Sequence, residues 1–160
     1  MVELLDTAKV LREATSRSLV ILDELGRGTS TFDGMAIAHS VLLYLVRSIR
    51  CLGLFATHYR PLAIECAREA GIRCQYMNCM LHPDTRQVTF LYKLTEGISP
   101  RSYGMNVAAM AGLPPSLIAE AEAMAVQVEQ NIQPTAQQAE AFRLPRLVVE
   151  HLLESSDQSV

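Results

Sequence analysis

The chain has 160 residues, 14 Lys and Arg against 17 Asp and Glu, and a formal net charge of −3. Its content of 49% hydrophobic and 19% charged residues is typical of a globular protein and excludes a chain that is mainly disordered. The mild acidity excludes binding of nucleic acid by charge alone. No apolar run approaches the ~18–20 residues that cross a bilayer, and no basic-then-apolar leader pattern occurs, which predicts a soluble intracellular protein without a membrane partner.

The first third of the chain alternates between helical and strand patterns. Residues 3–16 carry apolar residues at helical spacing, and residues 19–22 form a short apolar run, typical of a strand buried on both faces. A long helix begins near residues 31–33, and a second apolar strand covers residues 51–57. Strand, helix and strand in this order predict a right-handed crossover and parallel pairing. The predicted buried stripe of the long helix is Ala38, Val41, Leu42, Leu45, Val46 and Ile49.

The next segment predicts a short helix and a hairpin. Residues 61–70 are expected to form a helix that Gly71 ends. Residues 75–82 and 87–94 have strand character, and the turn chemistry of residues 83–86 lies between them. We therefore expect an antiparallel hairpin at the edge of the sheet.

Two helices are predicted after the hairpin. Residues 103–111 and 116–132 have helical patterns, with the turn of residues 112–115 between them. The tail 134–160 is rich in Gln and Ala, partial disorder is expected there, and a last helix is predicted over residues 147–154. The inward stripe of the longer helix is expected to be Ile118, Ala121, Ala125, Val128 and Ile132.

The four cysteines do not form a C-x-x-C pair, and a disulfide scaffold belongs to much smaller secreted chains. A zinc site built from Cys66, Cys74, Cys79 and His82 is an alternative. The set has no tight ligand pair, so buried thiols on strands are the favoured interpretation.

An apolar strand that ends in two adjacent acids, Asp23 and Glu24, is the strongest local signal. Ligands of open parallel sheets bind outside the carboxyl ends of the strands. An Asp there can hold Mg²⁺ beside a nucleotide, and an adjacent Glu can orient or deprotonate an attacking water. Two acids that simply end a strand in solvent are the alternative, and it stays open at this point.

His58 follows the second predicted strand. If the two strands are parallel neighbours, His58 lies at the same edge as Glu24 and can hydrogen-bond a phosphate oxygen or the attacking water. A capping residue of the next helix, with Pro61 in the first turn, is an equally acceptable interpretation.

The loop of residues 26–31 is rich in glycine and hydroxyl groups. Its amides could cradle a phosphate, or the loop could be a flexible connection. It does not match the phosphate-loop pattern G-x-x-x-x-G-K-[ST], and the only lysines of the chain, Lys9 and Lys93, stand elsewhere. Any nucleotide site on this chain is therefore expected to be incomplete.

The two C-terminal helices suggest a helix-turn-helix unit, but their charge argues against contact with DNA. No Lys or Arg occurs between Arg101 and Arg143, whereas a helix in a groove needs cations for the phosphates. Met105, Met110 and Met124 suit packing against another protein surface or an ordinary core.

Several segments resemble the MutS family of DNA mismatch-repair ATPases. Residues 18–34, which read SLVILDELGRGTSTFDG, are similar to the hallmark segment of that family. Residues 55–59 resemble its switch-histidine motif, and residues 102–104 with 111–114 resemble its C-terminal dimerisation helices. The resemblance covers about residues 2–131.

Two further segments, residues 89–93 and 100–106, look most like one eukaryotic branch of the family. That branch pairs with a second homologue in the heterodimer for base mispairs and small loops. The resemblance implies a second MutS-type subunit in a hetero- or homodimer, mismatched double-stranded DNA bound through domains outside this chain, and a nuclear location.

The resemblance also implies roles for individual residues. Asp23 matches the Walker B aspartate that supports Mg²⁺, directly or through water, and Glu24 matches the acid that activates water. His58 matches the switch histidine near the γ-phosphate of ATP. The matching loop, residues 26–34, reaches across the dimer in the family. Glu24 and His58 are thus the expected catalytic residues, and the expected ATP-binding residues are Asp23, Gly26, Gly28, Thr29, Ser30, Thr31 and Asp33.

Nucleotide sites in the family are composite, because one subunit supplies the phosphate loop and the other a signature serine. Residues 1–3 align just after that serine, so the resemblance implies that both elements precede this segment in a longer protein. An ATP-dependent clamp on mismatched DNA is the implied activity of that protein. For the chain alone we expect little or no hydrolysis, and a non-catalytic dimerisation module is the alternative.

The expected fold is α/β, with part of an ABC-type P-loop NTPase sheet, an edge hairpin and a helix-turn-helix-like dimerisation unit. Residues 1–100 are assigned to the ATPase domain, residues 101–133 to the dimerisation unit and residues 134–160 to the tail.

Overall fold

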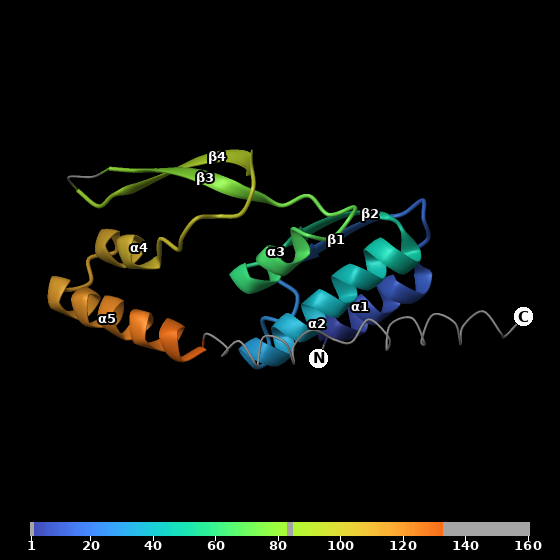
Figure 1. Ribbon diagram of the computed structural model, residues 1–160, viewed down its shortest axis with the longest axis horizontal. Coiled ribbons are helices and arrows are strands. Elements are labelled where there is room, and N and C mark those ends of the chain that lie inside the picture. The colour runs from blue at the N-terminus through green and yellow to red at the C-terminus, as the bar shows by residue number, and fades with distance from the viewer. Residues whose placement is uncertain (1, 83–84, 133–160) are drawn as a thin grey trace, which may run out of the picture. The chain divides into compact units, whose positions relative to one another are not determined.

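The structure, a computed structural model, describes residues 2–82 and 85–132. The chain divides into two units, the first ending at Ser102 and the second beginning at Tyr103. The predicted turn residues Pro83 and Asp84 and the predicted last helix of residues 147–154 lie outside the described residues. In chain order the first unit contains α1 (Val2–Glu13), β1 (Leu19–Asp23), α2 (Thr31–Tyr44), η1 (Leu45–Ile49), β2 (Leu52–Ala56), α3 (Arg60–Cys66), β3 (Gln75–Leu81) and β4 (Val88–Glu96) (Figure 1).

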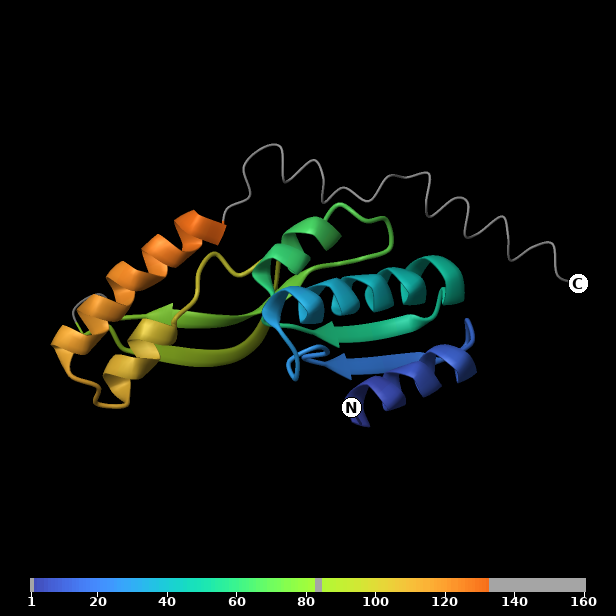
Figure 2. The same cartoon turned by 90° about the horizontal axis from the view of Figure 1, so that it is seen from below.

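β1 and β2 form a parallel pair, as the strand–helix–strand order predicted. Their register runs from Leu19 opposite Leu52 to Asp23 opposite Ala56. Helices α1 and α2 lie on the same side of this pair (Figures 1 and 2). Val20 of β1 is buried in one cluster with residues of α2 and η1, and α1 packs against that cluster.

The opposite face of the pair carries four large apolar side chains that the described part of the chain leaves exposed. Strands buried on both faces were predicted, and this is wrong for the described residues, because both helices cover the same face. The exposed fractions are 62% for Leu19, 65% for Ile21, 74% for Leu52 and 63% for Leu54.

The apolar stripe of α2 packs as its spacing predicted. Ala38, Val41 and Leu45 are buried, and the other members of the stripe are half-buried. The last turn is a π-helix, which the sequence pattern did not indicate. It ends at Arg50, which adopts a left-handed φ of 58° and donates its backbone N–H to the Leu45 carbonyl at 2.8 Å.

The helical stretch Thr31–Ile49 is long and apolar enough, by length and composition, to cross a membrane. The expectation that no segment approaches this length was therefore wrong. Length and composition are shared by membrane spans and by core helices, and here Ala38, Val41 and Leu45 lie in the core of the first unit.

The predicted helix after β2 is shorter than expected. α3 ends at Cys66, and turns carry the chain on to Gly71, whose φ is +91°. Within these turns, Glu69 accepts two hydrogen bonds from the Arg47 guanidinium, at 2.8 and 2.6 Å. This ion pair joins the turn to η1.

β3 and β4 form the predicted antiparallel hairpin, with a register irregularity between Met77 and Cys79. They make a separate two-stranded sheet, so the predicted place at the edge of the parallel sheet is wrong. The chain reaches β3 through the turns after α3, and the ladder hydrogen bonds of the hairpin are made between its own two strands.

All four cysteines are free thiols, and Cys66 is the buried one. Within residues 2–82 and 85–132, no group of three or more His, Cys, Asp or Glu side chains is arranged to hold a metal ion. The zinc alternative therefore gains no support, and Cys74 instead lies with its thiol 3.5 Å from the Ala63 carbonyl.

The second unit contains α4 (Gly104–Met110) and α5 (Pro115–Ile132), the two helices that the sequence predicted. Ile118 is buried, but Ala125 and Val128 are exposed, so the predicted inward stripe is wrong beyond Ala121. The reason is length: α4 has 7 residues and α5 has 18, so α4 is too short to cover the whole of α5. The side chain of Ile132 lies outside the described set.

Candidate functional site

The carboxyl ends of β1 and β2 form the rim of the candidate site. Asp23 and Ala56 are the last paired residues of the two strands. Glu24 follows and donates its backbone N–H to the Ala56 carbonyl at 2.9 Å. His58 follows β2 two residues later, so parallel pairing brings both strand ends to one edge.

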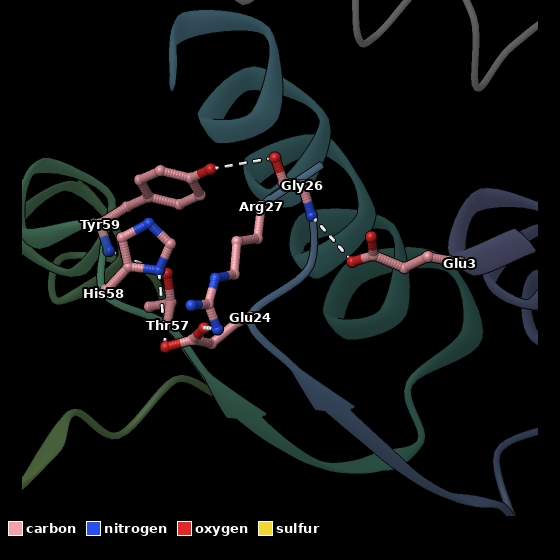
Figure 3. Close-up of polar contacts among 7 residues, drawn as sticks. All are labelled: Glu3, Glu24, Gly26, Arg27, Thr57, His58 and Tyr59. Carbon is pink, nitrogen blue, oxygen red and sulfur yellow. Dashed lines mark hydrogen bonds and ion pairs between the residues drawn. The ribbon is translucent and has the colours of Figure 1, made fainter. Parts of the chain in front are cut away.

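Glu24 and His58 lie close together at this rim. The Oε1 atom of Glu24 is 3.7 Å from His58 Nδ1, and its Oε2 atom accepts a hydrogen bond from Arg27 Nη1 at 2.8 Å (Figure 3). The side chain of Glu24 is 36% exposed and that of His58 is 49% exposed. The two side chains therefore share one edge of the sheet, as the strand order indicated, and both are partly exposed there.

Glu24 has a left-handed backbone, with φ of 50°. A non-glycine residue in this region costs about 1–2 kcal/mol, and such a conformation persists where surrounding contacts determine it. The turn directs the chain from β1 into the loop of residues 26–34 and directs the carboxylate toward Arg27 and His58.

Asp23 lines a different part of the rim. It borders an open cleft of about 440 Å³ between α1 and β1, which Glu3 and Asp6 also line. The described residues contain no group of three or more His, Cys, Asp or Glu side chains arranged as a metal site. Binding of Mg²⁺ by Asp23 thus stays a prediction, and Asp23 does not join the Glu24–His58 contact.

Gly26, at the base of the glycine loop, forms hydrogen bonds to side chains through both its backbone N–H and its backbone carbonyl. Gly26, with φ of +91°, donates its N–H to Glu3 Oε1 at 3.0 Å. Its carbonyl accepts a hydrogen bond from the Tyr59 hydroxyl at 3.1 Å (Figure 3). Because the amide of Gly26 already has a partner, the loop base is neither a free phosphate cradle nor a loose connection.

Two of the predicted ATP-binding residues begin α2. Ser30 accepts the backbone N–H of Asp33 at 3.3 Å and donates its hydroxyl to the Asp33 carboxylate at 2.8 Å. This is the N-cap that the hydroxyl and carboxylate pattern predicted. Gly28 and Thr29 of the loop are exposed, and so is Thr31, the first residue of α2.

Three residues of the site were missed in the sequence: Glu3, Arg27 and Tyr59. Tyr59 is 5% exposed, and its ring centroid lies 4.2 Å from that of His58. Its place directly after His58 was a signal that could have been used. Glu3 lies 23 positions before Gly26, and no local pattern connects the two.

The fold and the site define an α/β protein with an acid and an imidazole facing each other across the carboxyl ends of two parallel strands. Residues 1–129 match the model of MutS domain V. The chain therefore belongs to the MutS family, which confirms the resemblance seen in the sequence.

Eukaryotic mismatch repair proteins are similar over most of the chain. DNA mismatch repair protein msh3 of Aspergillus oryzae is 50% identical over 135 residues, covering 82% of this chain and 12% of the relative. DNA mismatch repair protein MSH7 of Arabidopsis thaliana is 46% identical over 140 residues (82% and 13%). DNA mismatch repair protein Msh6 of Gallus gallus is 43% identical over 135 residues (81% and 10%). The chain thus spans only 10–13% of the length of these relatives.

Proposed function

We propose that this chain supplies the water-activating half of an ATP-hydrolysing site in a DNA mismatch repair protein. The observation that carries the proposal is the 3.7 Å separation between Glu24 Oε1 and His58 Nδ1 at the ends of two parallel strands. The family supports a mismatch repair role. The ATPase role and the clamp on mismatched DNA are the proposed extension.

Glu24 is suited to accept a proton from an attacking water. One carboxylate oxygen is occupied by Arg27, and the other faces His58. A carboxylate within hydrogen-bond reach of the water acts as its base. The His58 imidazole, half exposed beside it, can bond to a γ-phosphate oxygen or to the same water.

The site is suited to a Mg²⁺ ion that binds together with the nucleotide. Mg²⁺ in nucleotide sites is held by one or two carboxylates together with phosphate oxygens. Asp23 offers one such oxygen ligand beside the cleft, and Mg²⁺ there would neutralise phosphate charge. The chain has no G-x-x-x-x-G-K-[ST] segment, so the proposal requires a phosphate cradle from another segment or from a second MutS-type subunit. The nucleus is the proposed location.

Release of phosphate from ATP tests the proposal at two levels. The chain alone, with ATP and Mg²⁺, should give no more turnover than its Glu24→Gln variant. In a whole MutS-type protein that carries this segment, Glu24→Gln should lower kcat at least about hundredfold with little change in ATP affinity, because it removes a base and not a binding charge. Glu13→Gln is the matched control. Turnover by the chain alone that Glu24→Gln abolishes would show that the site is complete without a partner segment.

A non-catalytic interaction module is the second candidate, favoured by the exposed apolar side chains of α5. Size-exclusion chromatography with and without a second MutS-type subunit tests it, and a strictly monomeric chain that ignores this subunit contradicts it. The most exposed of these side chains are Leu117 at 49%, Met124 at 56%, Val126 at 54% and Val128 at 45%.

A further inference from the structure

The backbone N–H and the backbone carbonyl of Gly26 each form a hydrogen bond with a side chain that is distant in the sequence. Glu3 is 23 residues before it and accepts its N–H at 3.0 Å. Tyr59 is 33 residues after it and donates its hydroxyl to the Gly26 carbonyl at 3.1 Å (Figure 3). Gly26 is buried, and its carbonyl also accepts a longer hydrogen bond from the Thr29 backbone N–H at 3.4 Å, so Glu3 and Tyr59 are its two side-chain partners.

Tyr59 connects Gly26 to the imidazole of the candidate site. Its ring packs beside His58, with centroids 4.2 Å apart and planes tilted by 43°. Its backbone N–H donates to Thr57 Oγ1 at 3.1 Å. The side chain is also part of a buried cluster with Ala38 and Leu62. Tyr59 is therefore fixed by the core and contacts both parts of the rim.

A second close contact ties the two ends of the glycine loop to Tyr59. A Cβ atom added at Gly34 would lie 2.3 Å from the Gly26 carbonyl oxygen and 2.6 Å from the Tyr59 hydroxyl. Gly34 therefore packs directly against the Gly26 carbonyl and the Tyr59 hydroxyl, with no space for a side chain at position 34. Glu24, two residues before Gly26, has the left-handed backbone that needs such support.

We propose that Glu3 and Tyr59 are positioning residues, which hold the turn at Glu24 and the imidazole of His58 in one arrangement. The two tethers fix Gly26, and through it they fix the turn that carries the Glu24 carboxylate. The ring of Tyr59 fixes His58 at the same time. This inference rests on the proposed function of the Glu24–His58 pair, and its test separates the two.

The first experiment measures amide hydrogen exchange and the His58 ring signals by NMR, on the whole 160-residue chain. Glu3→Ala should speed the exchange of the Gly26 amide about tenfold or more, since a hydrogen bond to a charged group is lost. Glu3→Gln, which keeps an acceptor, should restore most of the protection. Tyr59→Phe should shift the His58 ring signals while the melting curve stays cooperative. The controls are Glu13→Gln and Tyr44→Phe, which change exposed residues of the same types.

The second experiment measures ATP hydrolysis in a whole MutS-type protein that carries this segment. Tyr59→Phe should lower kcat about tenfold and leave the KM for ATP within about twofold, because the phenyl ring keeps its packing and only the hydroxyl tether is lost. Unchanged Gly26 exchange in Glu3→Ala, or unchanged His58 signals in folded Tyr59→Phe, would overturn the inference. A normal kcat in both the Glu3→Ala and the Tyr59→Phe proteins would also overturn the inference. Failure of the proposed function would give a different result, because the Glu24→Gln protein would then hydrolyse ATP at the normal rate.

Discussion

The parallel pair β1–β2 and the antiparallel pair β3–β4 are both two-stranded sheets, but they are stabilised differently. The strands of the parallel pair have five residues each, and two helices cover one of its faces. The strands of the hairpin are longer, with seven and nine residues. Among their side chains only Val88 is buried in the described structure, whereas Tyr92 is 82% exposed and Leu94 is 65% exposed.

The difference in packing between the two sheets explains why the candidate site lies at the parallel pair and not at the hairpin. At the ends of the parallel strands, Glu3 of α1 and Tyr59 both hydrogen-bond the backbone of Gly26, and His58 contacts Glu24. The hairpin has a register irregularity between Met77 and Cys79 and a left-handed Tyr92 with φ of 52°, and most of the apolar side chains of β4 are exposed. A fixed arrangement of reacting groups needs support from several elements, and only the first pair has it within the described residues.

Replacement of Leu25 by Ala is expected to have the largest effect on stability. Leu25 is 1% exposed and lies in the cluster under the candidate site. Truncation of a buried leucine costs about 2–5 kcal/mol through lost burial and the cavity left behind. Urea unfolding of the chain, followed by circular dichroism, measures the change in the free energy of unfolding.

Leu94→Ala is the matched control in the hairpin. Because Leu94 is 65% exposed, the same substitution there should change the free energy of unfolding by no more than about 0.5 kcal/mol. Equal losses at both positions would show that the hairpin is packed as firmly as the parallel pair, and the comparison would fail.

The reactivity of Cys66 is the second test of the comparison. Burial raises the pKa of the Cys66 thiol to about 11, and neighbouring Cys74 and acidic groups add to the shift. At pH 8 such a thiol is about a thousandth ionised, against roughly a quarter for an ordinary thiol, and the thiolate is the reactive form. Cys66 should therefore react with a maleimide about a hundredfold more slowly than half-buried Cys79 of the hairpin. Mass spectrometry of partly labelled chains measures both rates, and equal rates would contradict the burial of Cys66.

The sequence predicted most of the elements because their causes are local. Apolar periodicity identified the stripe around Val41, and turn residues separated the two strands of the hairpin. The uncovered sheet face was not predictable, because an apolar run such as residues 19–22 has the same pattern whether one or both faces find a partner. The hairpin was predicted, but its separation from the parallel sheet was not, since pairing between distant strands has no local signal.

The candidate site was predictable only as far as strand ends determine it. Parallel order alone indicated that Glu24 and His58 share an edge, and the 3.7 Å contact agrees with it. Alternation along β1 places Asp23 on the uncovered face with Leu19 and Ile21, and the two adjacent acids in the sequence did not show that Asp23 and Glu24 would separate. The tethers from Glu3 and Tyr59 depend on the left-handed turn after β1 and on packing between elements distant in the sequence.

The ion pair between Arg47 and Glu69 should give the smallest effect, and the size of this effect depends on pH. The hydrogen bond from Arg47 lowers the pKa of the Glu69 carboxyl. A lowered pKa in the folded state stabilises the protein above the ordinary Glu pKa of about 4.3, and this contribution is lost as the pH falls through the folded value.

Arg47→Gln should therefore cost about 0.5–1 kcal/mol at pH 7, since the two side chains are 41% and 22% exposed and the pair is bidentate. The cost should decrease steadily below about pH 4, where the unfolded carboxyl and then the folded carboxyl become protonated. A double-mutant cycle with Glu69→Gln, measured by urea unfolding at both pH values, isolates the pair. Arg73 and Glu96, 3.9 Å apart and both 79% exposed at the base of the hairpin, are the matched pair, and their cycle should give no measurable coupling at either pH. Coupling of equal size in the two cycles would mean that the turn after α3 is no better fixed than the hairpin it leads into.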